Sequence, residues 1–320
     1  MSLLGQILTP DLFAAAIRLA TPIALAAMGA AIGERSGVVN IALEGIMLAS
    51  AFFGTVVAIF THSAWLGVLG GVLGALVFTS LHAWAAINLQ ADQIVSGTAI
   101  NILAAGVTGF LMEAIFGHPG TTDPIPTIPP LFDFPTGGHG FFATVWTWID
   151  TIVFSYTPLV YFGIFCAVFL TWALFRTRWG LRLRALGEHP RAADTVGISV
   201  RRGRWVAVLI SGAMAGLGGA NLALEQVGGF TEGMTNGRGF IALAAMIFGR
   251  WIPGGGYLAS LLFGFADALQ IKLQIFSDII RIPPQFFLML PYVLTVIVLA
   301  GVVGKARAPA ADGKPYKAKG

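Results

Sequence analysis

The chain has 320 residues, of which 56% are hydrophobic and only 11% are charged. Its mean hydropathy of +0.81 exceeds what one soluble core can bury, so the composition excludes an ordinary soluble protein. The net charge of +4 does not indicate nucleic-acid binding, because no soluble domain is present to carry a basic face.

Apolar segments of about 20 residues match the roughly 30 Å of a bilayer, and helices pair their own backbone groups there. The sequence therefore predicts an all-α polytopic membrane protein with eight to ten transmembrane helices. The apolar segments lie at residues 11–31, 39–61, 64–88, 93–113, 152–175, 205–226, 239–250, 256–272 and 286–304.

The basic residues predict the orientation. Eight of the 19 Lys and Arg residues lie in the segment 176–204, and five follow Gly304. Both regions are expected on the cytoplasmic side, because positive loops stay inside. The Pro-rich segment 114–151, which follows the first four spans, lacks Lys and Arg. We therefore expect it on the extracytoplasmic side. Counting spans then predicts an extracytoplasmic N-terminus and a cytoplasmic turn at residues 33–37.

One transmembrane domain, residues 1–320, accommodates these features. We expect a first helical group at 11–113, followed by a Pro-rich extracytoplasmic loop at 114–151 and a linking helix at 152–175. A cytoplasmic loop at 176–204 then leads to a second helical group at 205–304. The remaining residues, 305–320, are expected to form a disordered cytoplasmic tail near lipid headgroups. The two groups cross the membrane in opposite senses, which is the arrangement of an inverted-topology repeat. Similar Gly-led strings at residues 37–45 and 239–247 support it.

Motifs for catalysis are missing. The single Gly-Lys pair, Gly304-Lys305, is not part of a phosphate-binding loop, and the sequence has no His-Glu-x-x-His motif. The serines followed by glycine also lack the preceding glycine of a nucleophile elbow. We therefore expect no enzymatic activity in this chain and no metal or cofactor bound by it.

Polar side chains inside apolar spans cost free energy and often mark a pathway. We expect a translocation pathway near five of them, although helix-to-helix hydrogen bonds explain them as well: Asn40, Glu44, Gln93, Asn101 and Asn221. Arg18, Glu225 and Asp267 are further ionisable residues inside spans. Glu44 follows Asn40 by one helical turn, so both side chains share a face.

The basic segment 176–204 has a helix pattern of its own. Pro190 suits a first helical turn, and Gly197 suits a helix end. Ala192, Ala193 and Val196 then offer a small apolar face, which is typical of a surface helix that docks into a groove on a cytoplasmic partner.

Within this segment, the run Gly187-Glu188-x-Pro190-x-Ala192-Ala193-x-x-x-Gly197 resembles the coupling segment of bacterial ATP-binding-cassette (ABC) importer permeases for simple sugars and nucleosides. Residues 33–45 and 237–251 also match that family, so the likeness covers about residues 15–300. It is greatest to the shorter member of two-permease nucleoside importers. The long Pro-rich loop and His189, where the family often has Asn, depart from the pattern.

The resemblance implies a type II ABC importer-like fold in the bacterial plasma (inner) membrane. It further implies cytoplasmic ATPase subunits that bind ATP and Mg, a second homologous permease in a heterodimer rather than a homodimer, and an extracytoplasmic substrate-binding lipoprotein. The substrate would be a nucleoside or simple sugar moved by alternating access. By this resemblance, the residues that couple to the ATPase are Gly187, Glu188, Pro190, Ala192, Ala193 and Gly197. An ATP-independent channel or secondary transporter for a small polar solute is the alternative.

Overall fold

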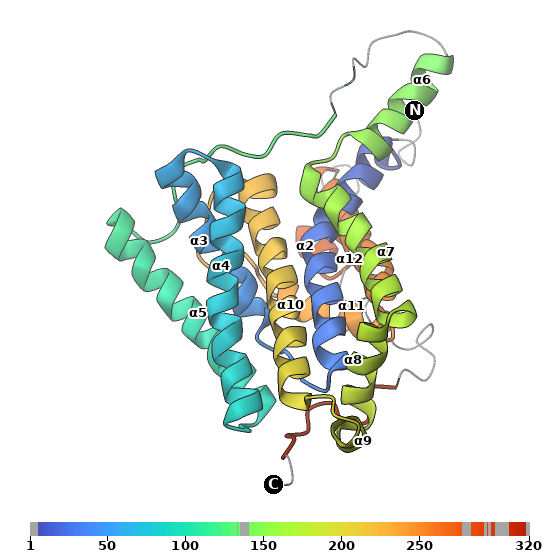
Figure 1. The fold of residues 1–320 in the computed structure, drawn as a ribbon. Helices are drawn as coiled ribbons and strands as arrows, with labels where there is room; N and C mark the ends of the chain where they lie inside the picture. Colours follow the sequence, from blue (N-terminus) through green and yellow to red (C-terminus); the bar gives the residue numbers. More distant parts are fainter. Residues whose placement is uncertain are drawn as a thin grey trace.

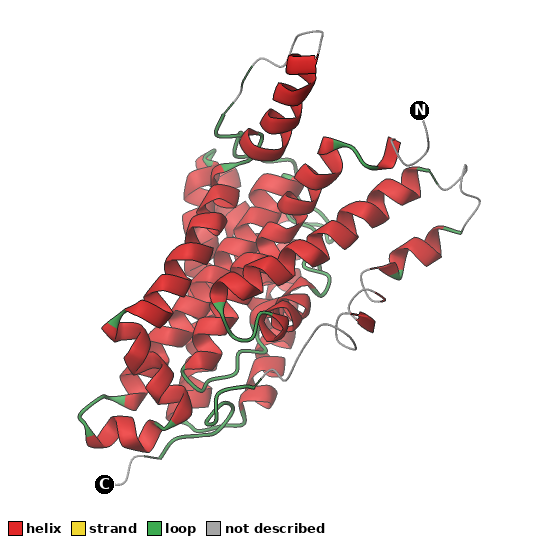
Figure 2. Ribbon diagram, turned by 90° about the vertical axis from the view of Figure 1, so that its right-hand side faces the viewer, coloured by secondary structure: helices red, strands yellow, loops and turns green. Residues whose placement is uncertain are grey.

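The computed structural model describes residues 6–132, 134, 141–276, 283–290, 293, 296, 297 and 307–317. Helices make up most of this part, and it contains no strand, only an isolated bridge between Thr121 and Thr231 (Figures 1 and 2). The helices are α2 (Pro10–Arg35), α3 (Leu43–Thr61), α4 (Ala64–Ala83), α5 (Gln93–Phe116), α6 (Phe141–Ile149), α7 (Pro158–Arg176), α8 (Arg178–Glu188), α9 (Pro190–Thr195), α10 (Val200–Asn221), α11 (Arg238–Phe248), α12 (Pro253–Ile275) and α14 (Pro284–Leu288), with short π-helical turns η1 (Trp84–Asn88), η2 (Asp150–Phe154) and η3 (Leu222–Val227).

Among the described residues, seven helices are long and apolar enough to cross a membrane: α2, α3, α4 with η1, α5, α7, α10 with η3, and α12. The all-α polytopic prediction is thus confirmed. The predicted span 239–250 corresponds to α11, which has only 11 residues and at about 1.5 Å per residue is too short to cross alone. The predicted span 286–304 lies largely outside the described residues.

Helices α2 and α10 run in opposite directions (Figure 1). At the end of the bundle that holds α8 and α9, Arg204 of α10 donates to the carbonyl of Ser36 after α2, at 3.1 Å. Near the other end, Gln226 after α10 donates to the carbonyl of Arg18 in α2, at 2.7 Å. Thus α2 and α10, the first helices of the two groups, are antiparallel, as an inverted repeat requires.

A reciprocal pair of glycines lets these two helices cross closely. A Cβ at Gly29 would lie 2.6 Å from the carbonyl oxygen of Ser211, and a Cβ at Gly218 would lie 2.6 Å from that of Pro22. Each helix thus presents a glycine to the backbone of the other. Small residues of this kind allow close packing where lipid supplies no hydrophobic drive between helices.

Substituting Gly29 with alanine should destabilise the protein. The new methyl group would meet the Ser211 carbonyl at 2.6 Å and the Met214 Cβ at 2.8 Å, and overpacking of this kind costs about 1–3 kcal/mol. The measurement is the thermal unfolding midpoint in detergent. Gly106→Ala in α5 is the matched control, because no atom lies within 4 Å of its added Cβ. Equal midpoints for the two variants would contradict the close crossing.

The extracytoplasmic loop differs from the prediction at its second half. Its first half is irregular and lies against the segment that follows η3, where the amide of Thr122 donates to the Phe230 carbonyl at 3.0 Å and that of Ile125 donates to Gly228 at 3.0 Å. Residues 141–154, however, form α6 and η2. Treating all of 114–151 as loop was wrong, because the aromatic run after Gly140 is apolar enough to form a helix.

Candidate coupling surface and translocation pathway

Polar side chains hold the break between α2 and α3. The side-chain oxygen of Gln93 accepts from the amide of Val39 at 2.7 Å, and His82 Nε2 lies 3.0 Å from the Val39 carbonyl. Asn101 accepts from the amide of Gly45 at 2.8 Å and donates to the Ile41 carbonyl at 3.0 Å. These bonds satisfy backbone groups that a broken helix leaves unpaired in the membrane.

Asn40 and Glu44 connect this break to the second helical group. Asn40 is fully buried and its amide donates to the hydroxyl of Ser211 in α10 at 3.1 Å. The carboxylate of Glu44 accepts from the amides of Gly237 and Gly239, at 2.8 and 2.7 Å. The N-termini of α3 and α11 therefore meet, and a negative charge lies at the positive end of α11. The structure brings Asn40, Glu44, Gln93 and Asn101 into one region.

Asn221, the fifth predicted pathway residue, lies elsewhere. Its amide donates to the carboxylate of Glu225, which also accepts from the Thr157 hydroxyl, and its oxygen accepts from Gln226 at 2.9 Å. Together with Arg18 these residues line an outer cavity of about 360 Å³ between α2, α7, η3 and α12. We call it the outer cavity. It combines hydrogen-bonding groups with apolar walls, as sites for small polar molecules do.

A clamp of Glu34, Arg35 and Trp251 joins the end of α2 to the turn between α11 and α12. Trp251, between α11 and α12, is 6% exposed and donates from its indole to the carboxyl of Glu34 at 2.6 Å. The neighbouring Arg35 donates to the Trp251 carbonyl at 2.9 Å and to that of Arg250 at 3.1 Å. Arg250 and Trp251 both have left-handed φ angles, 56° and 55°, which non-glycine residues rarely adopt. The end of α2 thus holds a strained turn in place.

The coupling segment, residues 176–204, forms α8, α9 and the start of α10 (Figure 1). As the pattern predicts, Pro190 opens α9, and Gly197 follows it with φ of 80°. Gly187 is buried with its Cα against the backbone of Arg35. Glu188 is exposed. The segment therefore contacts the end of α2 directly.

The predicted docking face of α9 is wrong at one residue. Ala192 and Val196 are exposed, but Ala193 is 3% exposed and packs with Leu186 and Val200 of the same chain. Ala193 lies on the side of α9 that Leu186 of α8 and Val200 of α10 cover, and Ala192 lies about 100° away on the free side. A substitution at Ala193 would disturb this chain's own packing.

The tail was expected to be disordered, and this is wrong for residues 307–317. These residues, the carboxyl-terminal segment, lie across α8 and α9, where the amide of Ala311 donates to the Gly187 carbonyl at 2.7 Å. Buried Ala311 and the hydrogen bonds of its neighbours explain why an Ala-, Pro- and Lys-rich composition is ordered here. Composition indicates only how a segment behaves without partners.

The docking of the carboxyl-terminal segment should weaken as pH rises. Burial raises the pKa of Asp312 to about 6, and hydrogen bonding to Glu34 and Gly313 and the charge of Arg204 only partly oppose this effect. Because the folded pKa lies above the ordinary value of 3.8, docking loses stability between about pH 4 and pH 6 and stays weaker above. A spin label at Lys317→Cys should become more mobile across this range. Asp312→Asn should remove the change; an unaltered pH profile would contradict the assignment.

A family model described as branched-chain amino acid transport system / permease component matches residues 12–299. The chain belongs to this permease family. The permease is 43% identical over 313 residues to the guanosine ABC transporter permease protein NupQ of Bacillus subtilis (strain 168), with 93% of each chain covered. It is 42% identical over 307 residues to the nucleoside ABC transporter permease protein NupC of Lactococcus lactis, covering 92% of this chain and 93% of NupC.

Two further comparisons are more distant. NupP, named a guanosine ABC transporter permease protein of the same Bacillus strain, is 25% identical over 285 residues, covering 82% of this permease and 74% of NupP. A solved ABC transporter of the metal-chelate type, in an inward-facing conformation, has a TM-score of 0.51 and 16% identity, with 92% of this chain and 85% of that chain covered. At this identity the likeness supports the fold alone, that of an ABC transporter membrane subunit.

Sequence reasoning missed the cytoplasmic clamp and the carboxyl-terminal segment of this permease. Glu34 and Trp251 fell within the matched stretches, yet nothing in their spacing indicated that their side chains meet across 217 positions. A tryptophan two residues before Pro253, which suits a first helical turn, was the available signal. For Asp312, which contacts Glu34, the sequence carries no comparable signal.

Proposed function

We propose that this permease is a membrane subunit of a nucleoside importer in the bacterial inner membrane. The observation that carries the proposal is the likeness to NupQ, which extends over 93% of both chains and therefore includes the spans as well as the coupling segment. Simple sugars are the second substrate class. The energy would come from ATP and Mg on a separate ATPase subunit, because the chain lacks a phosphate-binding loop.

The partners we propose are two cytoplasmic ATPase subunits, an extracytoplasmic substrate-binding lipoprotein and a second, different permease. Two observations favour a heterodimer. NupQ and NupP are different proteins of one Bacillus strain, and each is named a guanosine permease. This chain is much more similar to NupQ than to NupP, so it would take the place of only one of the two.

The contacts of the coupling segment support a route for movement. A push on α9 and on the end of α8, through exposed residues such as Ala192 and Glu188, would reach the backbone of Gly187, which lies against Arg35. Arg35 in turn holds the carbonyls of Arg250 and Trp251. A shift of α9 would therefore move the end of α2 together with the turn between α11 and α12. Packed elements of this kind move as units rather than deforming continuously.

For the pathway, we propose that substrate enters beside the outer cavity. Asn221, Glu225, Gln226 and Arg18 supply donors and acceptors that suit ribose hydroxyls and a nucleobase edge. Asn40, Glu44, Gln93 and Asn101 bind backbone and neighbouring side chains of the chain itself. In this proposal they hold the backbone of the break before α3 and of the start of α11 in place beside the pathway. They affect transport through the position of that backbone and do not bind the substrate.

The function is tested by purifying the tagged permease from its native membranes and reconstituting the complex. We expect ATPase subunits, a second permease and a lipoprotein to co-purify, and labelled guanosine to enter proteoliposomes only with ATP. Labelled glucose tests the second substrate class. Full uptake by this chain alone in ATP-free liposomes would favour the channel or secondary transporter instead and overturn the proposal.

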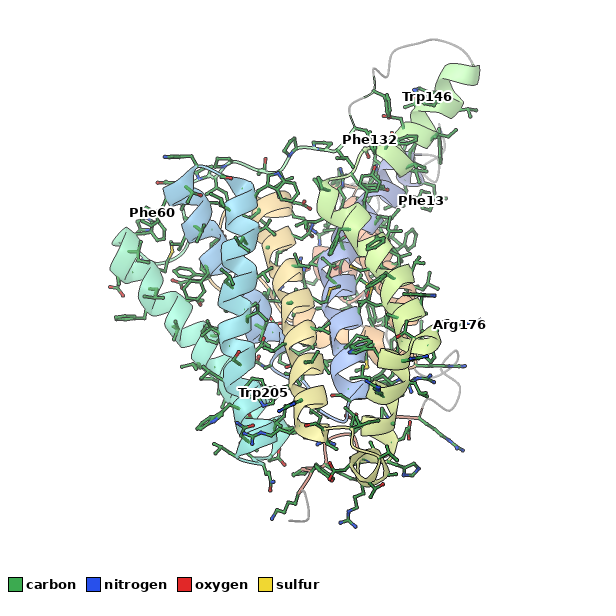
Figure 3. The ribbon with its side chains drawn as sticks, viewed as in Figure 1. Phe13, Phe60, Phe132, Trp146, Arg176 and Trp205 are labelled. Atoms are coloured by element: carbon green, nitrogen blue, oxygen red, sulfur yellow. The ribbon has the colours of Figure 1, made fainter. Side chains whose placement is uncertain are left out.

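The entry position is tested by Arg18→Gln, since Arg18 is exposed and lines the outer cavity. Loss of a charged hydrogen-bond donor should raise KM for nucleoside about ten-fold at unchanged protein abundance. Arg176→Gln is the matched control, because Arg176 is exposed at the cytoplasmic end of α7 (Figure 3). Equal KM values for the two variants would remove the outer cavity from the pathway.

A further inference from the structure

The carboxyl-terminal segment, residues 307–317, is bonded to both ends of α9. The amide of Ala310 donates to the carboxylate of Glu188 at 3.2 Å, just before the helix. The hydroxyl of Tyr316 donates to the carboxylate of Asp194 at 2.8 Å, at its end. The segment therefore spans the length of α9, alongside the residues expected to receive the ATPase.

The same segment is also fixed to the rest of the cytoplasmic end. Arg204 of α10 donates to the Lys314 carbonyl at 3.0 Å, and Gln90, between η1 and α5, donates to the Tyr316 carbonyl at 3.2 Å. The Tyr316 side chain packs against the cluster of Leu186, Ala193 and Val200. These contacts come from three separate parts of the fold. The segment is thus built into the coupling segment and must move with it.

A cleft of about 630 Å³ separates α9 from this segment. We call it the tail cleft. One wall consists of residues 188–192, and the other includes Ala310, Ala311 and residues 314–317. The basic side chains on the cleft are Arg191, Lys314 and Lys317, against the single carboxylate of Glu188, which the Ala310 amide already occupies. The hollow therefore has a net positive charge.

We propose that the carboxyl-terminal segment forms the second half of the ATPase docking surface, and that the tail cleft receives an acidic segment of the cytoplasmic ATPase subunit. The inference rests on the proposed function. Charge complementarity indicates which partner binds the tail cleft. Because the cleft is positive and lies beside α9, it favours a protein segment that carries carboxylates. A concave cleft with two walls suits an inserted protein segment, whereas a lipid surface would require a flat basic face.

The test compares the complete transporter with two variants of this permease. One variant lacks residues 307–320. The other, Lys314→Glu with Lys317→Glu, reverses two exposed charges on the cleft. It removes the bond from Lys314 Nζ to the Ala310 carbonyl but keeps the bonds that the segment's backbone makes with Gly187, Glu188 and Arg204. Lys314→Arg with Lys317→Arg is the matched control, because it keeps both positive charges on the cleft. The readouts are ATPase retained on the tagged permease and ATP-driven nucleoside uptake.

We expect both variants to retain at least ten-fold less ATPase than wild type, with lipoprotein binding unchanged and the control close to wild type. Should the truncated chain fail to fold, the double charge reversal decides the matter. Wild-type retention of ATPase by both variants would overturn the inference. So would increased retention by the truncated chain, or a charge reversal that weakens binding only to phosphatidylglycerol vesicles. A wild-type permease that brings down no ATPase would instead count against the proposed function.

Discussion

Glu44→Gln lowers the thermal unfolding midpoint of the permease and its yield of folded protein. Both carboxylate oxygens of Glu44 accept backbone amides at the start of α11, at 2.8 and 2.7 Å. Glutamine keeps one acceptor, loses the negative charge and turns an NH₂ group toward the second amide. The loss of a charge-assisted bond together with a buried unsatisfied donor costs about 1–3 kcal/mol. The measurement is the unfolding midpoint in detergent, with uptake normalised to folded protein.

Glu113→Gln is the matched control for this prediction, because Glu113 is exposed in the last turn of α5. We expect its midpoint to stay within a degree or so of wild type, since exposed substitutions usually change stability by less than about 0.5 kcal/mol. An unchanged midpoint in Glu44→Gln would show that α11 does not depend on this bond. Normal uptake per folded molecule would remove Glu44 from the pathway.

Trp251→Ala should lower the free energy of unfolding of this permease more than Gly29→Ala or Glu44→Gln. The indole is 6% exposed and packs within the main core cluster around α2, α3 and α11. Removing a buried tryptophan costs about 3–5 kcal/mol. It also removes the donor to Glu34 and loosens the left-handed turn that Arg35 holds. We therefore expect little folded protein, measured as the monodisperse fraction after solubilisation.

Two further variants separate packing from hydrogen bonding at this position. Trp251→Phe keeps most of the apolar volume but leaves Glu34 without the indole donor, so we expect an intermediate loss of about 1–3 kcal/mol. Trp65→Ala in α4 is the control, because that tryptophan is 54% exposed. If Trp251→Ala and Trp65→Ala lose equal amounts of folded protein, Trp251 is not part of a clamp.

Local sequence patterns predicted the helices of the permease well. They failed where contacts between distant segments determine which side chains are buried. The coupling segment, residues 176–204, contained its own helix start and stop signals, so α9 could be predicted to begin at Pro190 and to end before Gly197. The orientation of Ala193 could not be predicted as reliably, because α8 and α10 compete with any partner for that face. The helix at Phe141–Ile149 was missed for a different reason, because its local apolar run was read together with the Pro-rich residues that precede it.

The candidate site shows the same division. Five polar residues in apolar spans were recognisable as costly and therefore meaningful, but their spacing did not reveal that four of them gather at the start of α3 and α11 while Asn221 lies at the outer cavity. Each bond joins positions far apart in the chain, such as Glu44 and Gly239. Such pairings depend on how the two helical groups pack against each other.

The sequence by itself determined the class of this protein, the number of spans to within a few and the family to which it belongs. These properties follow from hydropathy, charge and local helix signals, which act over one or two turns of chain. Only the tertiary structure decided which polar groups pair, which face of α9 is free and that residues 307–317 are ordered. Those outcomes depend on burial by distant segments, and a buried polar group must find its partner wherever the fold brings one within hydrogen-bond distance.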